Sequence, residues 1–146
     1  MGKFKFSLEG VQRFKDQSLN TVKLEYAAAE NAVAEQKMQI ACLKEEYLKY
    51  KDDLKSKKEA GLSILEYNSL QSHLMFIQEN IEDENMKLGE LERKASLVRH
   101  KMVQAKIEAA SIESIRDQRL EEFNAEEKKK EDAFIEEFVS NKRLRS

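Results

Sequence analysis

Apolar residues recur along most of the chain at alternating intervals of three and four positions. This spacing places them in one narrow stripe along a helix, with charged residues on the other faces, which is typical of a left-handed coiled coil. Two such stripes are present and predict two long helices that pack on each other. The first contains Leu19, Val22, Tyr26, Ala29, Val33, Gln36, Ile40, Leu43, Tyr47, Tyr50 and Leu54, and the second Tyr67, Leu70, Leu74, Ile77, Ile81, Glu84, Leu88, Leu91, Ala95, Val98, Met102, Ala105, Ala109 and Ile112.

The two stripes are separated by a sequence that ends one helix and begins another. Gly61 suits the left-handed position after a helix, and Ser63 with Glu66 forms a capping box for the next one. These signals predict a first helix over about residues 5–59, a turn over about 60–63 and a second helix over about 64–140. The predicted fold is all-α: a single domain, residues 1–146, forming an antiparallel left-handed coiled-coil hairpin with a C-terminal helical overhang.

The position of the turn also predicts which residues face each other. Residues whose numbers add up to about 124 lie opposite, so Leu54 faces Leu70. Gln36 and Glu84, the polar members of the two stripes, then fall in neighbouring layers. Three interpretations are open: the pair is a locally weak point of the packing, it fixes the register of the helices, or each side chain reaches solvent at the edge of the stripe.

The second helix is predicted to be longer than the first. Phe4 lies opposite about residue 120, so an overhang of about 26 residues extends ~39 Å without a partner. It is expected to carry Phe123 and an apolar patch formed at helical spacing by Phe134, Ile135, Phe138 and Val139. We expect this patch to bind another molecule.

Composition excludes most other classes of function. The chain has no proline, 37% charged residues and a net charge of −2, which disfavours turn-rich catalytic folds and provides no field for binding nucleic acid. Gly61 and Gly89 form no phosphate-binding loop, and His73, His100 and Cys42 are too far apart to hold a metal. We expect no cofactor, no enzymatic activity, no membrane span and a cytoplasmic location.

A second candidate surface lies near the predicted turn. Tyr47 and Tyr50 are expected to pack in the stripe, with their hydroxyls at its edge. Met75 and Phe76 lie outside the stripe and close to the end of the hairpin. An exposed patch at this end is therefore a further candidate for partner binding.

Several short motifs resemble those of the flagellar export protein FliJ family. The chain opens with the pattern F-x-F-x-L-x-x-V, its two heptad arms flank a single glycine, and its C-terminal helix carries a stretch similar to the family's L-D-E motif, with glutamate where aspartate is usual. The residues concerned are Phe4, Phe6, Leu8, Val11, Gly61 and Ile135-Glu136-Glu137-Phe138.

The resemblance implies a non-enzymatic stalk, similar to the rotor stalk of rotary ATPases, that enters the ring of the flagellar export ATPase FliI. It further implies contacts with the ATPase regulator FliH, the export gate FlhA and empty substrate chaperones, at the cytoplasmic face of the inner membrane. The candidate ring contacts are Phe4, Phe6, Phe123, Phe134, Ile135, Phe138 and Val139. The candidate gate contacts are Tyr47, Tyr50, Met75 and Phe76.

Two other functions fit the same pattern. One is the equivalent stalk of a virulence-type secretion system, which genomic neighbours or captured partners would distinguish. The other is a structural tether that covers its apolar patch by dimerising, whereas the stalk is expected to be a monomer on its own. Light scattering at micromolar concentration separates these two states.

Overall fold

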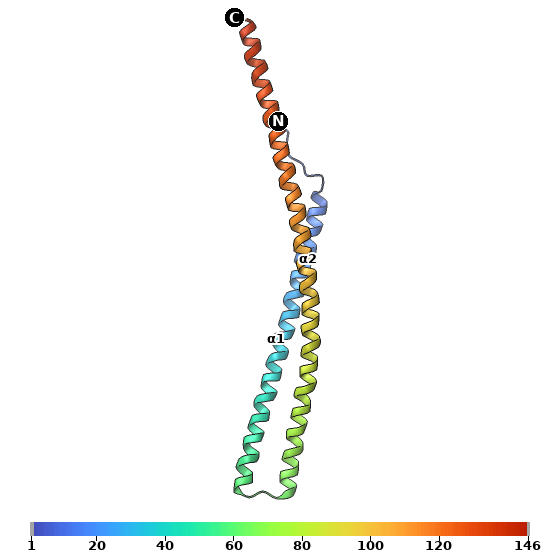
Figure 1. Ribbon diagram of the computed structural model, residues 1–146, viewed down its shortest axis with the longest axis vertical. Coiled ribbons are helices and arrows are strands. Elements are labelled where there is room, and N and C mark those ends of the chain that lie inside the picture. Colours follow the sequence, from blue (N-terminus) through green and yellow to red (C-terminus); the bar gives the residue numbers. More distant parts are fainter. Residues whose placement is uncertain (1, 146) are drawn as a thin grey trace. The chain divides into compact units, whose positions relative to one another are not determined.

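A computed structural model describes residues 2–145, which form two helices and no strand (Figure 1). Helix α1 spans Glu9–Ala60 and helix α2 spans Ile64–Arg145. The prediction of an all-α chain with two long helices packed as a hairpin is confirmed. The chain divides into two compact units, Val22–Met102 and the remainder, residues 2–21 with 103–145.

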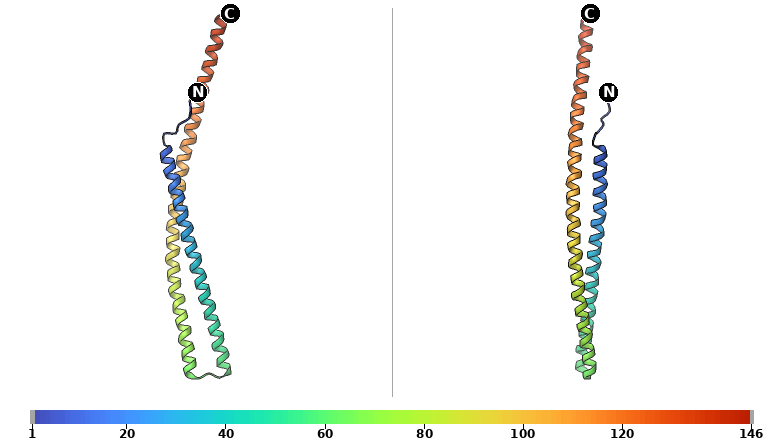
Figure 2. Two further views of the ribbon diagram at one scale, coloured as in Figure 1. Left: turned by 180° about the vertical axis from the view of Figure 1, so that it is seen from behind. Right: turned by 90° about the vertical axis from the view of Figure 1, so that its right-hand side faces the viewer.

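The unit Val22–Met102 contains the turn and the two arms that it joins, which run antiparallel (Figure 2). Every residue of the two predicted stripes within this unit is buried or half-buried. The buried ones are Gln36, Ile40, Leu74, Ile77 and Val98. The alternation of three and four positions therefore identified the contact surface of both helices.

The packed layer between the arms is thin. No described side chain is less than 2% exposed, because two helices can cover only one side of each other. Most stripe residues keep one edge in solvent, so the stabilisation is spread over many layers.

The turn follows the predicted chemistry. Gly61 has a φ of 101°, a backbone conformation that side chains with a Cβ rarely adopt. The Ser63 hydroxyl accepts a hydrogen bond from the backbone N–H of Glu66 at 3.2 Å and so caps the start of α2. Lys58 lies over the ring of Tyr67, 5.7 Å from its centroid, and links the two sides of the turn.

The other unit shows where the predicted helix bounds differ from the structure. Helix α1 begins at Glu9 instead of about residue 5, and α2 continues to Arg145 instead of about residue 140. Residues 2–6 are not helical, and the backbone N–H of Glu9 donates to the carbonyl of Phe6 at 3.1 Å. Leaving the helix lets the Phe6 ring turn towards α2, where it is 7% exposed.

The packed layer gives a direct test of its energetics. Ile77 is 2% exposed and Leu97 on the same helix is 68% exposed. We expect Ile77→Ala to lower the free energy of unfolding by about 2 kcal/mol, the low end for truncation of a large core residue, because the layer is thin. Leu97→Ala should change it by less than about 0.5 kcal/mol. Urea unfolding followed by circular dichroism measures both, and equal losses would show that Ile77 is not part of a packed layer.

Candidate partner-binding surfaces

The C-terminal end of α2 presents an apolar patch to solvent. Every residue from 128 to 145 is exposed. Phe134 and Phe138 are 68% and 62% exposed, and they lie on the same side of the helix as Ile135 and Val139. These four residues, here called the tail patch, are brought together by the structure as the sequence predicts. In Figure 1 no other segment of the same unit lies beside this end of α2.

Charged residues precede the tail patch on α2. Lys130 and Glu127 approach to 4.0 Å, one turn apart. Such exposed pairs stabilise an isolated helix by only about 0.2–0.5 kcal/mol each, which is small against the cost of helix nucleation and fraying. A partner that covers the tail patch would therefore also order this end of the helix.

Three of the predicted ring contacts, Phe4, Phe6 and Phe123, lie where the N-terminal segment meets α2. The rings of Phe4 and Phe123 lie 5.6 Å apart, and the Arg119 guanidinium lies 5.7 Å from the centroid of Phe6. Arg119 also donates a hydrogen bond to the Ser7 hydroxyl at 2.6 Å. These side chains attach the non-helical residues 2–6 to α2.

This arrangement corrects the predicted overhang. Phe4 lies beside Phe123 and not beside residue 120, so Phe123 is not in an unpartnered segment. Gly2 lies near Phe123 and Glu127, which extends the covered part of α2 further. The exposed end begins at residue 128 and is about 27 Å long, shorter than predicted. The sequence did not reveal this contact because residues 2–6 follow no helical period.

Exposed polar contacts continue the attachment of α1 to α2 in this unit. Gln12 donates to the Glu113 carboxylate, and Lys15 lies 2.9 Å from Glu108. Solvent-exposed ion pairs contribute little stability. They nevertheless define which residues of the two helices face each other.

The candidate gate contacts divide into two kinds. Tyr47 and Tyr50 are half-buried in the packed layer, and the Tyr50 ring meets His73 edge-on at 4.4 Å. Met75 and Phe76 are exposed, as expected for residues outside the stripe. The exposed pair alone can contact a partner without any rearrangement of the hairpin.

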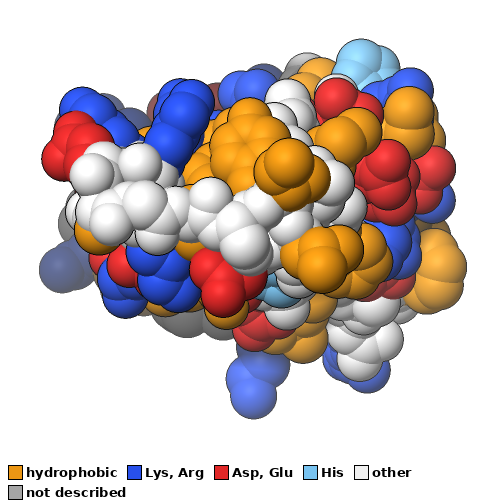
Figure 3. All heavy atoms as spheres, turned by 90° about the horizontal axis from the view of Figure 1, so that it is seen from below, with side chains coloured by type: hydrophobic (Ala, Val, Ile, Leu, Met, Phe, Trp, Pro, Cys, Tyr) orange, Lys and Arg blue, Asp and Glu red, His pale blue; other side chains and the backbone are white. Residues whose placement is uncertain are grey.

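The turn end carries two further exposed apolar residues, which the spacing pattern does not predict as a binding surface. Ile64 and Leu65 begin α2 and are among the most exposed large apolar side chains of the unit. Figure 3 views the molecule from this end and shows apolar side chains interspersed with charged ones. Ile64 and Leu65 lie beside Gly61 and outside the stripe, and this position is the signal in the sequence that could have identified them.

The polar members of the two stripes bind each other. Gln36 is 8% exposed, and its side-chain amide donates to the backbone carbonyl of Glu84 at 2.9 Å and also to the Glu84 carboxylate. The interpretation that Gln36 reaches solvent is therefore wrong. The pKa of Glu84 lies below its usual value because Gln36 donates to the carboxylate and, second, because Lys87 donates to it at 3.2 Å.

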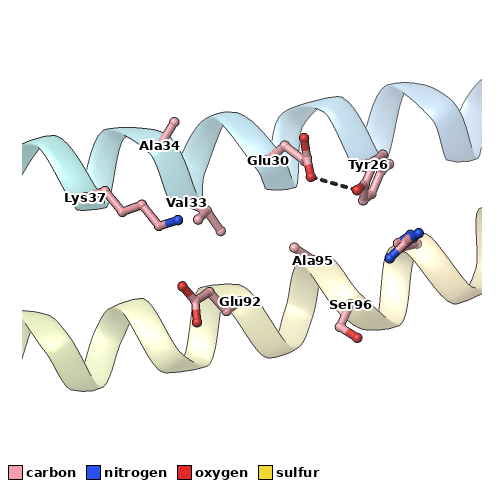
Figure 4. A pocket seen from close by; sticks show the side chains of 9 residues that line it. Tyr26, Glu30, Val33, Ala34, Lys37, Glu92, Ala95 and Ser96 are labelled. Carbon is pink, nitrogen blue, oxygen red and sulfur yellow. Dashed lines mark hydrogen bonds between the residues drawn. The ribbon is translucent and has the colours of Figure 1, made fainter.

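A shallow groove on one face of the Val22–Met102 unit is lined mainly by charged and small residues (Figure 4). The Tyr26 hydroxyl donates to Glu30 at 2.7 Å, and this bond raises the pKa of Tyr26, with burial and the Glu30 charge adding to it and Arg99 opposing it. Lys37 and Glu92 enter the groove from opposite helices.

Neither helix, within the described residues, contains a stretch both long and apolar enough to cross a membrane. Among residues 2–145, no three side chains of the types that bind metals come together. Cys42 is exposed and forms no disulfide.

A family model for FliJ, described as the flagellar FliJ protein, matches residues 4–146. The matched region includes both helices and the N-terminal segment with Phe4 and Phe6. Comparison with curated proteins gave no match, and neither did comparison with solved structures.

The Gln36–Glu84 contact predicts a pH dependence. A carboxyl group whose pKa is lowered by folding stabilises the protein above its unfolded pKa, here 4.5, and this contribution disappears as the pH falls through the lower folded pKa. Glu84→Gln should therefore be less stable than the native chain at pH 7, and the difference should shrink as the pH falls below 4.5. Thermal unfolding between pH 7 and pH 3 measures it. A difference that does not change with pH would contradict the contact.

The N-terminal cluster predicts local protection from proteolysis. In Phe6→Ser, residues 2–6 should detach from α2 while helix content stays the same, since these residues are not helical. Trypsin should then cut after Lys3 on the order of tenfold faster, which corresponds to about 1.4 kcal/mol of lost packing. Phe14→Ser, at an exposed position of the same unit, is the control and should leave the rate unchanged. Equal rates in the two variants would show that Phe6 does not hold the segment.

Proposed function

Because the chain belongs to the FliJ family and is a component of the flagellar export machinery, we propose that it acts as a helical stalk for the export ATPase. In this role the C-terminal end of α2 binds the ATPase ring and raises its activity. The catalytic groups belong to the ATPase, and this chain contributes a binding surface. The proposal places the chain at the cytoplasmic face of the inner membrane.

The tail patch is the observation that carries this proposal. Phe134, Ile135, Phe138 and Val139 form an apolar strip on one side of an exposed helix. Such a strip binds partners by inserting into an apolar groove, with neighbouring charges adding to the rate and specificity of association. Phe4, Phe6 and Phe123 remain candidate ring contacts in this proposal, and in the free chain they attach the N-terminal segment to α2.

Stimulation requires more than binding. A stalk changes the activity of a ring only if it binds one arrangement of the subunits more tightly than the others. The tail patch would supply this preference if the groove on the ring that receives it is complete in one nucleotide state and incomplete in another. Binding energy at the patch is then coupled to the nucleotide cycle without any covalent step in this chain.

A second contact is proposed for the turn end of the hairpin. Met75 and Phe76 are exposed on α2, Tyr47 and Tyr50 are half-buried on α1, and we assign the surface that these residues form near the turn to the export gate. Binding of the ATPase regulator and the escort of empty substrate chaperones are further roles that membership of the family suggests. A dimeric tether remains the competing function, in which the tail patch would be covered by a second copy.

The two surfaces serve as controls for each other. Phe134→Ser/Phe138→Ser should keep native helix content and thermal stability, because both rings are exposed, and should raise the stalk concentration needed for half-maximal ATPase stimulation by at least about tenfold. Met75→Ser/Phe76→Ser should leave that concentration unchanged and should weaken binding to the cytoplasmic domain of the gate. ATPase assays and binding assays with purified partners measure both effects.

Two results would contradict the proposal. Unchanged stimulation by Phe134→Ser/Phe138→Ser would show that the tail patch does not bind the ring. A native chain that is a stable dimer at micromolar concentration, and a monomer after these substitutions, would favour the tether.

A further inference from the structure

The side of α2 that contacts the N-terminal segment continues into the tail patch. Phe134 follows Phe123 by about three turns of helix, which is about 16 Å, with a rotation of only about 20°. Phe138 is rotated from Phe123 by about 60°, so the three rings project from the same side of α2. A shallow groove joins the two regions, with Gly2 and Phe123 at one end and Phe134 at the other. This side of α2 is therefore one strip, covered in its first part and exposed in its second.

The exposed part alone is small for a stable interface. The four side chains of the tail patch are 43–68% exposed. A stable interface buries about 800 Å² on each partner, and four such side chains supply roughly half of that. A partner helix that extended along the same side towards the start of α2 would reach Gly2 and the ring of Phe4, which lies against Phe123. It would gain the missing area only by replacing the N-terminal segment there.

The N-terminal segment is attached by few contacts. None of residues 2–5 forms a hydrogen bond or an ion pair with another described residue. The attachment depends on the ring contact of Phe4 and on Arg119, which lies 5.7 Å from the ring centroid of Phe6 and donates to the Ser7 hydroxyl. A segment with few buried contacts and no hydrogen-bonded backbone detaches at a low cost in free energy. A partner can therefore displace it.

We propose that the surface of α2 that binds the export ATPase begins at Phe123, and that residues 2–6 cover its first part in the free chain and leave it when the ATPase binds. This inference rests on the function proposed above and extends its binding surface. Only molecules with a detached segment can use the whole strip, so the apparent affinity is reduced in proportion to their fraction. The same step releases the rings of Phe4 and Phe6, which then become available to the ATPase.

Arg119→Gln tests the proposal by detaching the segment without changing any aromatic ring. The rate of trypsin cleavage after Lys3 measures the detached fraction, and circular dichroism should show native helix content. We expect the stalk concentration for half-maximal ATPase stimulation to fall by the same factor by which the cleavage rate rises, because both follow the detached fraction. Arg93→Gln, at an exposed position of α2 in the other unit, is the charge-matched control and should change neither quantity.

A cross-link tests the opposite change. A Cβ at Gly2 would lie 3.5 Å from a carboxylate oxygen of Glu127, so a short bismaleimide can join Gly2→Cys to Glu127→Cys in a Cys42→Ser background. Half-maximal stimulation should require at least about tenfold more of the cross-linked chain than of the same chain before cross-linking. Glu127→Cys in the same background, modified with a single maleimide, carries similar bulk with a free segment and should match the chain before cross-linking.

Phe123→Ser separates release of the segment from use of the surface beneath it. This variant should accelerate trypsin cleavage after Lys3, as Arg119→Gln does, because the segment loses its ring contact. It should nevertheless raise the concentration for half-maximal stimulation, because the ATPase loses an apolar contact. The two variants are therefore expected to change the affinity in opposite directions.

Either of two results would overturn the proposal. One is native stimulation by the cross-linked chain, or by Arg119→Gln with its segment detached, which would show that the segment does not compete with the ATPase. The other is equal gains of affinity in Phe123→Ser and Arg119→Gln, which would show that the bound ATPase does not use Phe123. Failure of the proposed function is distinguishable, because Phe134→Ser/Phe138→Ser would then leave stimulation unchanged as well.

Discussion

The narrow contact between two helices is the constraint on which the rest of the structure depends. Each helix can cover only one stripe of its partner, so no described side chain is fully enclosed. The free energy of folding is therefore spread over many partly exposed layers, and no single layer dominates it. This distribution tolerates a glutamine in one layer that is hydrogen-bonded to a glutamate in the neighbouring layer.

The same constraint explains why part of α2 is exposed. The covered part of α2 ends where the N-terminal segment ends, near Phe123 and Glu127. Beyond that point the alternation that builds the contact is replaced by a charged run followed by the tail patch. Apolar side chains placed there do not stabilise this unit, which is why we assign them to a partner.

The sequence predicted the elements that follow a local rule. The stripes repeat with a helical period, and Gly61 and Ser63 are residues typical of helix ends. The fold and the tail patch could therefore be predicted. The N-terminal segment could not, because Phe6 is buried by leaving the helix and by meeting Arg119, which is distant in sequence. The bonds between Gln36 and Glu84 were also missed, since spacing alone does not show whether a side chain turns inward or reaches solvent.

The central claim is that residues 128–145 form an exposed helix end that becomes covered when the export ATPase binds. Hydrogen exchange measured by mass spectrometry, on the chain alone and with the purified ATPase, tests it most directly. The account predicts fast exchange of these amides in the free chain, strong protection in the complex and little change in residues 22–102. Protection of these amides in the free chain, or protection by the ATPase confined to residues 22–102, would contradict it.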